Sequence, residues 1–421
     1  MKTILKKAKI YDFGAPLHGK ERDIVIDQGV IQRIDESIDS EGDARIISSS
    51  SLAVSPSWCD LKANFRDPGE EFKEDLESGS RAALAGGFGY VGITTGTQPV
   101  IDNKSQVRYI SRQNSPENIV ELVPQGAISK GLMGDELAEM YDMHRHGVCF
   151  FNDDEKCLSA GLLYRALLYT KNFESRVVSF PMNFSMIPNG QVNEGIASIR
   201  TGLNGIPAIG EAIQVQRDLR LLDYTEGKLH FTGISSADSV RQIEEAKSNG
   251  LNVTCDVHAH QLLFTEEAVL GFDTQHKVMP PLRTQADQDA LWKGLENGTI
   301  DAIVSNHQPE TVEFKNVEFN RAAFGNNSIQ SIFSALITAR PDAVDIIIRK
   351  LAYDGRNLLL GKKHSSIEQG QTVDLTIFDT REKWRFTADQ LASKSSNDPF
   401  LNQELTGKVL GVIKGNYDNL K

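Results

Sequence analysis

The chain has 421 residues, of which 40% are hydrophobic and 24% charged, and its formal net charge is −12. The apolar fraction excludes a disordered chain, and the absence of any run of about 18 apolar residues argues against a membrane helix. The acidic balance argues against a nucleic-acid partner, which requires clustered Lys and Arg. Four scattered cysteines without a CxxC pair predict neither a zinc knuckle nor a disulfide framework, so we expect a soluble, cytoplasmic protein.

Both ends of the chain are rich in short apolar runs separated by Gly, Pro and Asp, a pattern typical of β-strands and turns. The runs are Thr3–Tyr11, Asp23–Ile26, Val30–Ile34, Gln371–Asp379 and Lys408–Asn416. Because both ends share this pattern around one long middle, we expect them to build one domain together. The prediction is a small β-sandwich domain formed by residues 1–54 and 366–421.

The middle of the chain alternates between short apolar runs and helix-like segments. The apolar runs are Gly89–Ile93, Gly147–Phe151, Val177–Phe180, Lys228–Phe231, Asn252–Val257 and Asp301–Val304. Two segments are expected to be helices, Gly69–Ala85 and Asp238–Gly250, the second with Asp238 as N-cap and Gly250 as C-cap. This alternation predicts a parallel α/β domain, and its length suits a TIM-type (β/α)8 barrel over residues 55–365.

A doubly wound sheet is the alternative α/β fold. The sequence lacks both the G-x-G-x-x-G fingerprint and the P-loop pattern that often accompany such sheets. Gly86–Gly89 resembles a phosphate loop, but it follows a helix and precedes a strand, which is the wrong order. We interpret it as a helix C-cap and turn.

Catalytic residues of a barrel lie at the C-terminal ends of its strands. Polar side chains follow the expected strands at several of these places. They occur in Asp60–Asp67, Thr94–Pro99, Asn152–Asp154, Asn183–Ser185, Gly233–Ser236, His258–His260 and Ser305–Glu310.

In this order, these segments resemble a class I type dihydroorotase of the cyclic amidohydrolase superfamily. The resemblance spans nearly the whole chain and rests on several motifs that are individually weak but specific together. They are Asp67–Asp75, Ala85–Gly89, Gly205–Pro207, Ala246–Gly250, Pro280–Arg283, Asp301–His307, Phe324–Gly325 and Ser393–Phe400. The resemblance implies a metal-bearing barrel with a small β-sandwich, and the reversible closure of carbamoyl-aspartate to dihydroorotate.

The resemblance also implies six metal-ligand positions. Five of them carry residues that do not replace the expected ligand. They are Lys62, Asn64, Asn183, Gly233 and Asn306, where Asn306 stands for the catalytic aspartate. An ammonium repels a cation, glycine has no side chain, and amides are poor zinc ligands. The carboxylate position is retained in Asp153 and Asp154, and the sequence leaves open which of them faces the barrel mouth.

Lys62 suggests a hypothesis of its own. Its ammonium is expected to face the aspartate pair and to neutralise Asp153 or Asp154, which would stabilise the mouth without metal. The alternative is that Lys62 extends to solvent.

Of the substrate-binding positions that the resemblance implies, only Arg66 is retained as a carboxylate-binding candidate. Gly96 stands where the family has an amide, and Met279 where it has a polar side chain. Glu310 places an anion where an anionic substrate would bind.

A different metal site remains an alternative, because four histidines lie near the expected strand ends. His258 and His260 stand at i, i+2 and would share one face of a strand, and His230 and His307 survive from the family motifs. The simpler interpretation is polar lining for the first two and a supporting structural role for the others. His144 and His146 are expected at a helix C-terminus.

Three functional hypotheses follow. The first is a metal-free, catalytically inactive member of the family that acts through protein contacts. The resemblance implies aspartate carbamoyltransferase as the partner, and homo-oligomers are expected. The second is an active cyclic amidohydrolase with a rebuilt zinc site, and the third is a small-molecule sensor that keeps Arg66. The first hypothesis predicts no cofactor.

Overall fold

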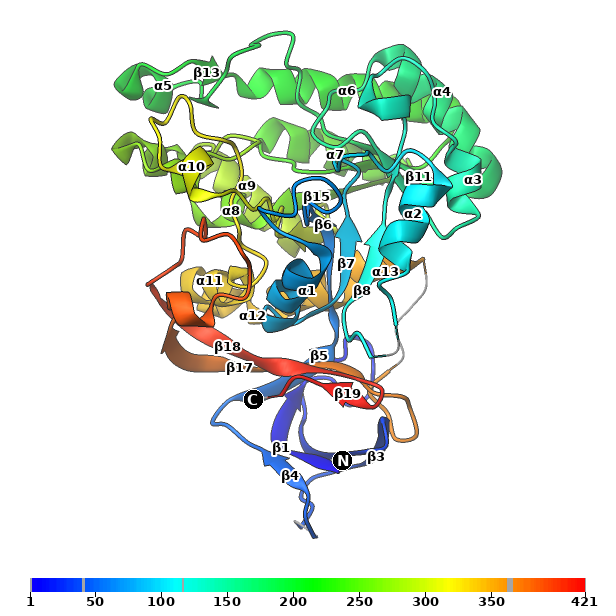
Figure 1. Cartoon of the computed structure of the whole chain (residues 1–421), viewed down its shortest axis with the longest axis vertical. Helices are drawn as coiled ribbons and strands as arrows, with labels where there is room; N and C mark the ends of the chain where they lie inside the picture. Colours follow the sequence, from blue (N-terminus) through cyan, green and yellow to red (C-terminus); the bar gives the residue numbers. More distant parts are fainter. Residues whose placement is uncertain (1, 40–41, 116, 362–365, 421) are drawn as a thin grey trace.

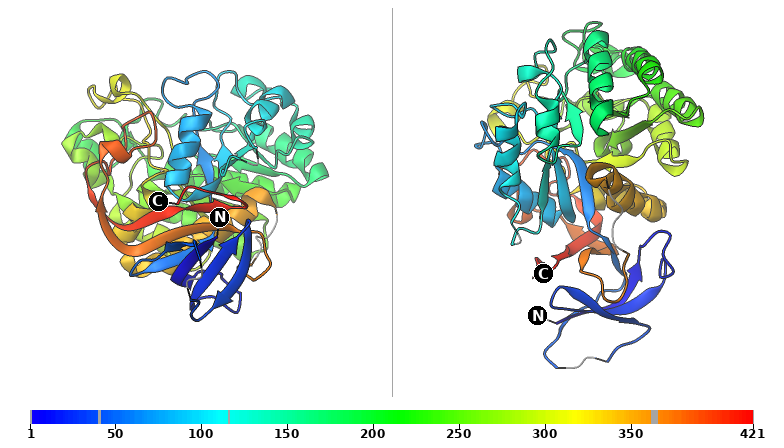
Figure 2. Two further views of the ribbon diagram at one scale, coloured as in Figure 1. Left: turned by 60° about the horizontal axis from the view of Figure 1, so that its bottom comes forward. Right: turned by 90° about the vertical axis from the view of Figure 1, so that its right-hand side faces the viewer.

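The computed structural model describes residues 2–39, 42–115, 117–361 and 366–420. Parallel strands surrounded by helices form its larger part, and a separate sheet from both ends of the chain lies beneath (Figure 1). Figure 2 shows this sheet as blue N-terminal strands beside the long orange and red strands of the C-terminal region. This arrangement confirms the predicted fold class.

The terminal strands join one eight-stranded sheet, here called the terminal sheet, with the order β19-β18-β17-β5-β1-β2-β3 and β4 paired to β1. Its apolar side buries residues such as Leu5, Ile24, Val54 and Leu375. Its strands are Thr3–Ile10 (β1), Glu21–Asp27 (β2), Val30–Asp35 (β3), Arg45–Ile47 (β4), Leu52–Pro56 (β5), Asp374–Arg385 (β17), Glu404–Lys414 (β18) and Tyr417–Asp418 (β19).

The barrel strands pair in parallel and in chain order. β6 pairs with β7 and β7 with β8, while β9 continues to β10, β11, β14, β15 and β16. Only Gln125 separates β8 from β9, and a parallel bridge from Ala63 to His307 joins β6 to the segment after β16. The strands are Trp58–Ala63 (β6), Phe88–Ile93 (β7), Glu121–Pro124 (β8), Gly126–Ala127 (β9), Phe150–Asn152 (β10), Arg176–Ser179 (β11), Leu229–Phe231 (β14), Val253–His258 (β15) and Ala302–Val304 (β16).

Helices cover the outside of the barrel, and α4, α6, α7 and α9 pack in succession. α4 illustrates why: Ser159 caps its first turn, and Leu162, Leu163, Ala166 and Leu167 form its buried face. The helices are Leu76–Ala85 (α1), Lys104–Ser111 (α2), Met140–His144 (α3), Ala160–Thr170 (α4), Ile196–Thr201 (α5), Ala208–Thr225 (α6), Ala237–Ser248 (α7), Ala259–Leu263 (α8), Gln285–Glu296 (α9), Val312–Lys315 (α10), Ile332–Ala339 (α11), Val344–Arg349 (α12) and Gly355–Leu360 (α13). Strands Val192–Asn193 (β12) and Gly205–Ile206 (β13) flank α5.

An aromatic cluster joins the terminal sheet to the barrel. The rings of Trp58 and Phe333 lie 4.7 Å apart, and Phe378 on β17 lies 5.3 Å from each of them. All three side chains are buried, and such aromatic contacts contribute about 0.5–1.5 kcal/mol each beyond area burial. The two parts therefore share a core.

Several predicted boundaries are wrong in detail. The helix predicted over Gly69–Ala85 begins only at Leu76, because Asp75 caps it through a reciprocal capping box with Ser78. The N-cap of α7 is Ser236 rather than Asp238, and Asn249 is its C-cap, although Gly250 follows with a φ of +82°. Of the C-cap and turn predicted over Gly86–Gly89, Gly86 caps α1 and Gly87 turns the chain, whereas Phe88 and Gly89 already lie in β7.

The strand predictions are largely confirmed, but β8 and β9 were missed, and Asp60 lies within β6 rather than after it. His144 ends α3, as expected. In the described residues, no helix combines the length and the apolar character that spanning a bilayer requires. The domain boundaries stay a prediction: β5 runs to Pro56, and residue 365 lies outside the described residues.

Candidate functional site

Lys62 lies at the centre of the barrel mouth, near the C-terminal end of β6. Its side chain is 6% exposed, and its Nζ lies 3.5 Å from Oε1 of Glu155 and 3.4 Å from Nε2 of His258. The ammonium also lies 5.1 Å from the centroid of the Phe180 ring. Lys62 therefore does not extend to solvent, and the carboxylate within hydrogen-bond distance of its ammonium is Glu155 rather than the predicted Asp153 or Asp154.

The two retained aspartates point in different directions. Asp153 accepts hydrogen bonds from the backbone N–H groups of Ile128 and Ser129 and from the Ser129 hydroxyl, so it fixes a loop. Asp154 lines the inner space of the mouth with Lys62. Burial raises the pKa of Asp154 and of Glu155, and the Lys62 ammonium acts in the opposite direction. Asp154 is therefore the inward-facing aspartate.

Neighbouring side chains occupy the space beside two glycines at the mouth. A Cβ placed at Gly96 would lie 1.9 Å from Oδ2 of Asp154, and a Cβ at Gly233 would lie 2.7 Å from Nε2 of His258. Gly233 also has a φ of +73°, which favours glycine. The space left at the centre of the mouth is about 10 Å³, no more than a single water requires.

His258 and His260 lie together, but not as alternating residues of one strand. His258 ends β15 and His260 lies in α8, with the ring centroids 5.3 Å apart. Burial, followed by the nearby Lys62 charge, lowers the pKa of His258 well below 6.5 and that of His260 to about 3. Both rings are therefore neutral at pH 7 and buried in the mouth, which supports the interpretation as polar lining.

The three asparagines at predicted ligand positions have separate surroundings. Asn64 accepts a hydrogen bond from the Arg66 N–H and donates to the Gly96 carbonyl, and Asn183 accepts from Ser185. Asn306 is buried with a φ of +48°, and its Oδ1 has no partner among the described residues. Among the described residues, no hydrogen bond joins any two of these three side chains.

His230 and His307 are held by the fold. His230 contacts Thr254 at 2.8 Å and Asp256 at 2.9 Å, which links β14 to β15. His307 lies 3.5 Å from Glu74 and packs edge-on against Phe65. These contacts support the structural interpretation rather than a metal site with His258 and His260.

Arg66 already has a carboxylate partner within the chain. Its Nη2 lies 2.7 Å from Oε1 of Glu310, while Lys73 lies 3.0 Å from the other oxygen of that carboxylate. Arg66 also donates to the side chain of Gln308 at 3.1 Å. Glu70 lies 3.5 Å from Arg66 and 2.8 Å from Lys73. Glu70 and Glu310 together therefore balance the two cations that an anionic ligand would otherwise meet.

Met279 belongs to an apolar cluster beside the mouth. It packs with Phe180, Met182 and Ile206, and the cluster borders a cavity of about 170 Å³. Asn183 and Phe324 also line this cavity. The side chain at position 279 therefore contributes to packing rather than to polar recognition.

Comparisons with known proteins agree with this architecture. A family model described as dihydro-orotase-like matches residues 52–239. A dihydroorotase of Caldicellulosiruptor saccharolyticus is 40% identical over 418 residues, which cover 97% of this chain and 96% of the relative. The chain belongs to the dihydroorotase family.

A second curated relative and a solved structure add to these matches. A dihydroorotase of Acetivibrio thermocellus is 37% identical over 401 residues, covering 94% of this chain and 93% of the relative. The L-hydantoinase (dihydropyrimidinase) of Arthrobacter aurescens superposes with a TM-score of 0.84 at 20% identity, covering 100% of this chain and 96% of that structure. The latter likeness concerns the fold alone.

The residues at the mouth do not fit the metal that the dihydroorotase resemblance implies. Within the described ranges, no three His, Cys, Asp or Glu side chains lie together in an arrangement that could hold an ion. Glu155 and His258 lie 3.5 and 3.4 Å from the Lys62 ammonium, which would repel a divalent cation.

Several residues of the mouth are not apparent from the sequence of this dihydroorotase-family chain. Glu155 directly follows the aspartate pair, so a longer motif window would have included it. Lys73 lies in the acidic segment Glu70–Glu74, where it resembles an ordinary surface residue. Its pairing with Glu310 depends on the fold and has no signal in the sequence.

Proposed function

We propose that this protein is a cytoplasmic dihydroorotase-family member of pyrimidine biosynthesis that lacks metal-dependent catalysis and acts through contacts with other proteins. The observation that carries the proposal is the buried Lys62 ammonium between Glu155 and His258. A fixed positive charge there opposes the binding of divalent cations. No cofactor is required by this proposal.

The chemistry of ring closure supports the same proposal. Zinc-bound water has a pKa of about 7, which makes hydroxide available as a nucleophile. Without the metal this nucleophile is lost, and Asn306 has an amide that takes no proton at neutral pH. Loss of a general base alone costs about 10²–10⁴ in rate. Glu310 in addition occupies the carboxylate-binding position at Arg66.

A second candidate is an active cyclic amidohydrolase with a rebuilt zinc site. The observation that favours it is the name dihydroorotase of relatives that are 33–40% identical over nearly the whole chain. In this case Asp154, His258 and His260 would have to rearrange around an ion and displace Lys62.

One purified preparation separates the two candidates. Metal content is measured by mass spectrometry, and ring closure of carbamoyl-aspartate is measured on the same sample with and without added zinc. The first proposal predicts substoichiometric metal and no closure above the uncatalysed rate. Stoichiometric zinc together with metal-dependent closure would establish the second candidate instead.

The surface offers a region for protein contacts. Four isoleucines are exposed on α5 and on the first turns of α6: Ile196, Ile199, Ile209 and Ile213, with exposures of 57, 83, 52 and 44%. Exposed apolar clusters often mark interaction sites. We propose these exposed isoleucines as the contact for aspartate carbamoyltransferase.

The contact is tested by size-exclusion chromatography of the chain alone and mixed with aspartate carbamoyltransferase from the same organism. Ile199→Asp should abolish any complex or oligomer, because it places a charge in an apolar interface. The matched control is Val312→Asp on α10, another exposed apolar residue. The contact would be contradicted if the chain eluted as a monomer and formed no complex with the transferase.

A further inference from the structure

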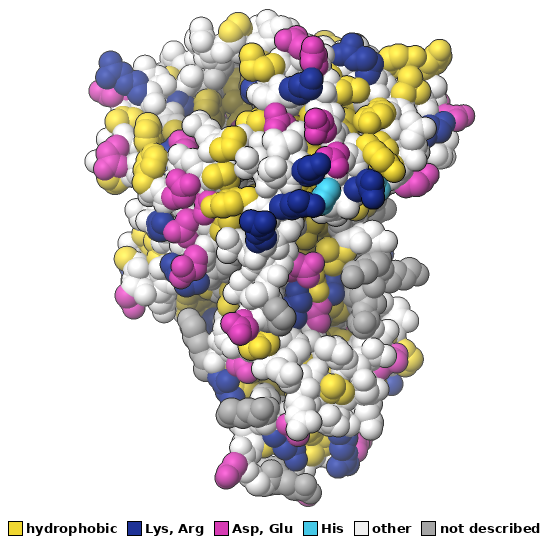
Figure 3. All heavy atoms as spheres, turned by 45° about the vertical axis from the view of Figure 1, so that its right-hand side comes forward, with side chains coloured by type: hydrophobic (Ala, Val, Ile, Leu, Met, Phe, Trp, Pro, Cys, Tyr) yellow, Lys and Arg dark blue, Asp and Glu magenta, His cyan; other side chains and the backbone are white. Residues whose placement is uncertain are grey.

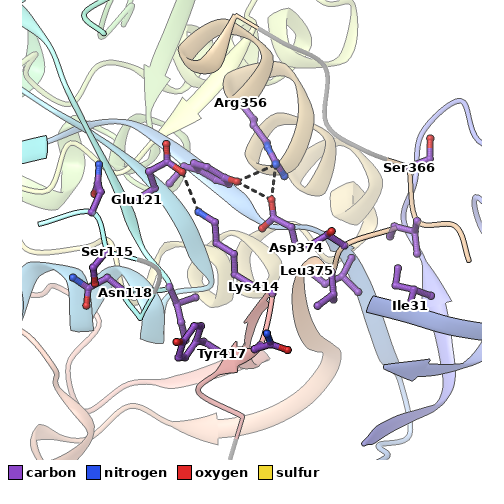
Figure 4. A pocket seen from close by; sticks show the side chains of 18 residues that line it. Ile31, Ser115, Asn118, Glu121, Arg356, Ser366, Asp374, Leu375, Lys414 and Tyr417 are labelled. Carbon is purple, nitrogen blue, oxygen red and sulfur yellow. Dashed lines mark hydrogen bonds and ion pairs between the residues drawn. The ribbon is translucent and has the colours of Figure 1, made fainter. Parts of the chain in front are cut away.

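A large cavity lies between the terminal sheet and the end of the barrel opposite the mouth. Its volume is about 800 Å³, which is within the range of small-molecule sites. Tyr90 near the start of β7, Glu121 at the start of β8 and Arg356 on α13 contribute the barrel side. Asp374 on β17 and Lys414 on β18 contribute the sheet side (Figure 4). None of these residues lines the barrel mouth.

Four charged side chains of the cavity wall pair with one another around Tyr90. Nζ of Lys414 lies 3.2 Å from Oε2 of Glu121 and 3.9 Å from the centroid of the Tyr90 ring. Nη2 of Arg356 lies 2.5 Å from Oδ2 of Asp374 and 3.2 Å from the Tyr90 hydroxyl. The two positive and two negative charges of these four side chains therefore sum to zero. A ligand with a net charge would leave one charge uncompensated in a partly buried site, so the wall favours an uncharged ligand.

The wall nevertheless keeps hydrogen-bonding capacity for a ligand. The side chains of Lys414 and Glu121 are 24% and 44% exposed, so a donor and an acceptor face the cavity side by side. An adjacent donor and acceptor match the NH–C=O edge of a cyclic amide or a nucleobase.

Apolar and polar surfaces divide the remainder of the lining. Ile31, Leu375 and the exposed ring of Tyr417 form apolar walls, and an aromatic ring at the opening suits a planar ligand. Asn118 and Asn416 are exposed at the rim and offer amides to hydroxyl groups. The lining thus combines a planar apolar surface, an amide-like pair of hydrogen-bonding groups and a polar rim.

We propose that this cavity is a second ligand site that binds an uncharged nucleoside. The base would contact Tyr417 and the Lys414–Glu121 pair, and the sugar hydroxyls would contact the amides at the rim. Because the lining comes from both the barrel and the terminal sheet, bound nucleoside stabilises the two parts together. The site is independent of the barrel mouth and of the function proposed for it.

Isothermal titration calorimetry with uridine, adenosine and UMP tests the proposal. We expect at least one of the two nucleosides to bind with a Kd below about 1 mM, and UMP to bind at least 10-fold more weakly because it brings uncompensated charge. Tyr417→Ala should weaken nucleoside binding by about 10-fold through lost stacking. Its matched control is Tyr224→Ala, an exposed tyrosine on α6, which should leave binding unchanged.

A second cavity variant keeps the proposal testable if the Tyr417→Ala protein does not fold. Lys414→Gln keeps a donor but removes the balancing charge, so it should weaken nucleoside binding as well. Circular dichroism of each variant establishes that it is folded before titration. The proposal is overturned if neither nucleoside binds, if UMP binds more tightly than both, or if binding persists unchanged in both cavity variants.

Discussion

Replacing Lys62 by methionine tests the central feature of the barrel mouth. Methionine keeps the length and the apolar stem of the side chain and removes the ammonium. Asp154 and Glu155 would then share a buried space without the cation that now lies 3.5 Å from Glu155. We expect Lys62→Met to lower the melting temperature of the protein at pH 7.

The magnitude follows from the burial of the pair. Breaking a buried ion pair costs about 3–5 kcal/mol, and the 26% exposure of Glu155 places this case at about 3 kcal/mol. An unfolding entropy of about 2.1 cal/mol/K per residue gives about 0.9 kcal/mol/K for the chain. The expected decrease in melting temperature is therefore about 3 °C for cooperative unfolding.

The pH dependence distinguishes a charge effect from a packing effect. Burial raises the pKa of Asp154 and of Glu155, and removal of Lys62 raises both further. Folded Lys62→Met protein then binds more protons than the unfolded chain, so its deficit should grow from pH 5 to pH 7. Differential scanning calorimetry at both pH values measures this difference.

A matched control uses an exposed lysine in a surface ion pair. Lys130 lies 2.9 Å from Glu136, but both side chains are at least 60% exposed. Lys130→Met should change stability by less than about 0.5 kcal/mol. If Lys62→Met behaved like this control at both pH values, the ammonium would have no role in holding the mouth together.

Three further predictions concern the same end of the barrel. Glu310→Gln should destabilise the protein by about 3 kcal/mol because Arg66 and Lys73 would then share Glu70 as their carboxylate, and added acetate should restore part of the melting temperature in this variant only. His260 has a pKa of about 3 when folded, so stability should fall by about 2 kcal/mol from pH 6.5 to pH 5, and His260→Gln should remove that part of the slope in urea titrations. Gly96→Ala should cost about 1–3 kcal/mol by displacing the carboxylate of Asp154, and a double-mutant cycle with Asp154→Ala should recover most of this loss; strictly additive effects would contradict the contact.

The sequence predicted most of the fold because short apolar runs between Gly and Asp coincide with barrel strands. The start of α1 was predicted too early, since the charged segment Glu70–Glu74 resembles the first turns of a helix. In the structure, Glu74 is instead buried beside His307 and accepts a hydrogen bond from Ser393. Tertiary contacts of this kind override local propensity.

The candidate site was only partly predictable. The family motifs identified Lys62, Arg66 and Glu310. They did not show that Lys62 pairs with Glu155 or Arg66 with Glu310, because each pair lies far apart in the chain. Partner choice depends on which loops meet at the mouth, and one sequence contains no direct signal for that.

Figure 3 shows that acidic and basic side chains lie near one another on the face shown, apart from a short row of basic side chains over the barrel.

The fit between Gly233 and the ring of His258 couples these two positions. A Cβ at position 233 would lie 2.7 Å from the imidazole, on a backbone whose φ of +73° disfavours a side chain. A side chain at position 233 would therefore require a change at position 258 as well. Substitutions at the two positions are expected to be tolerated together and not one at a time.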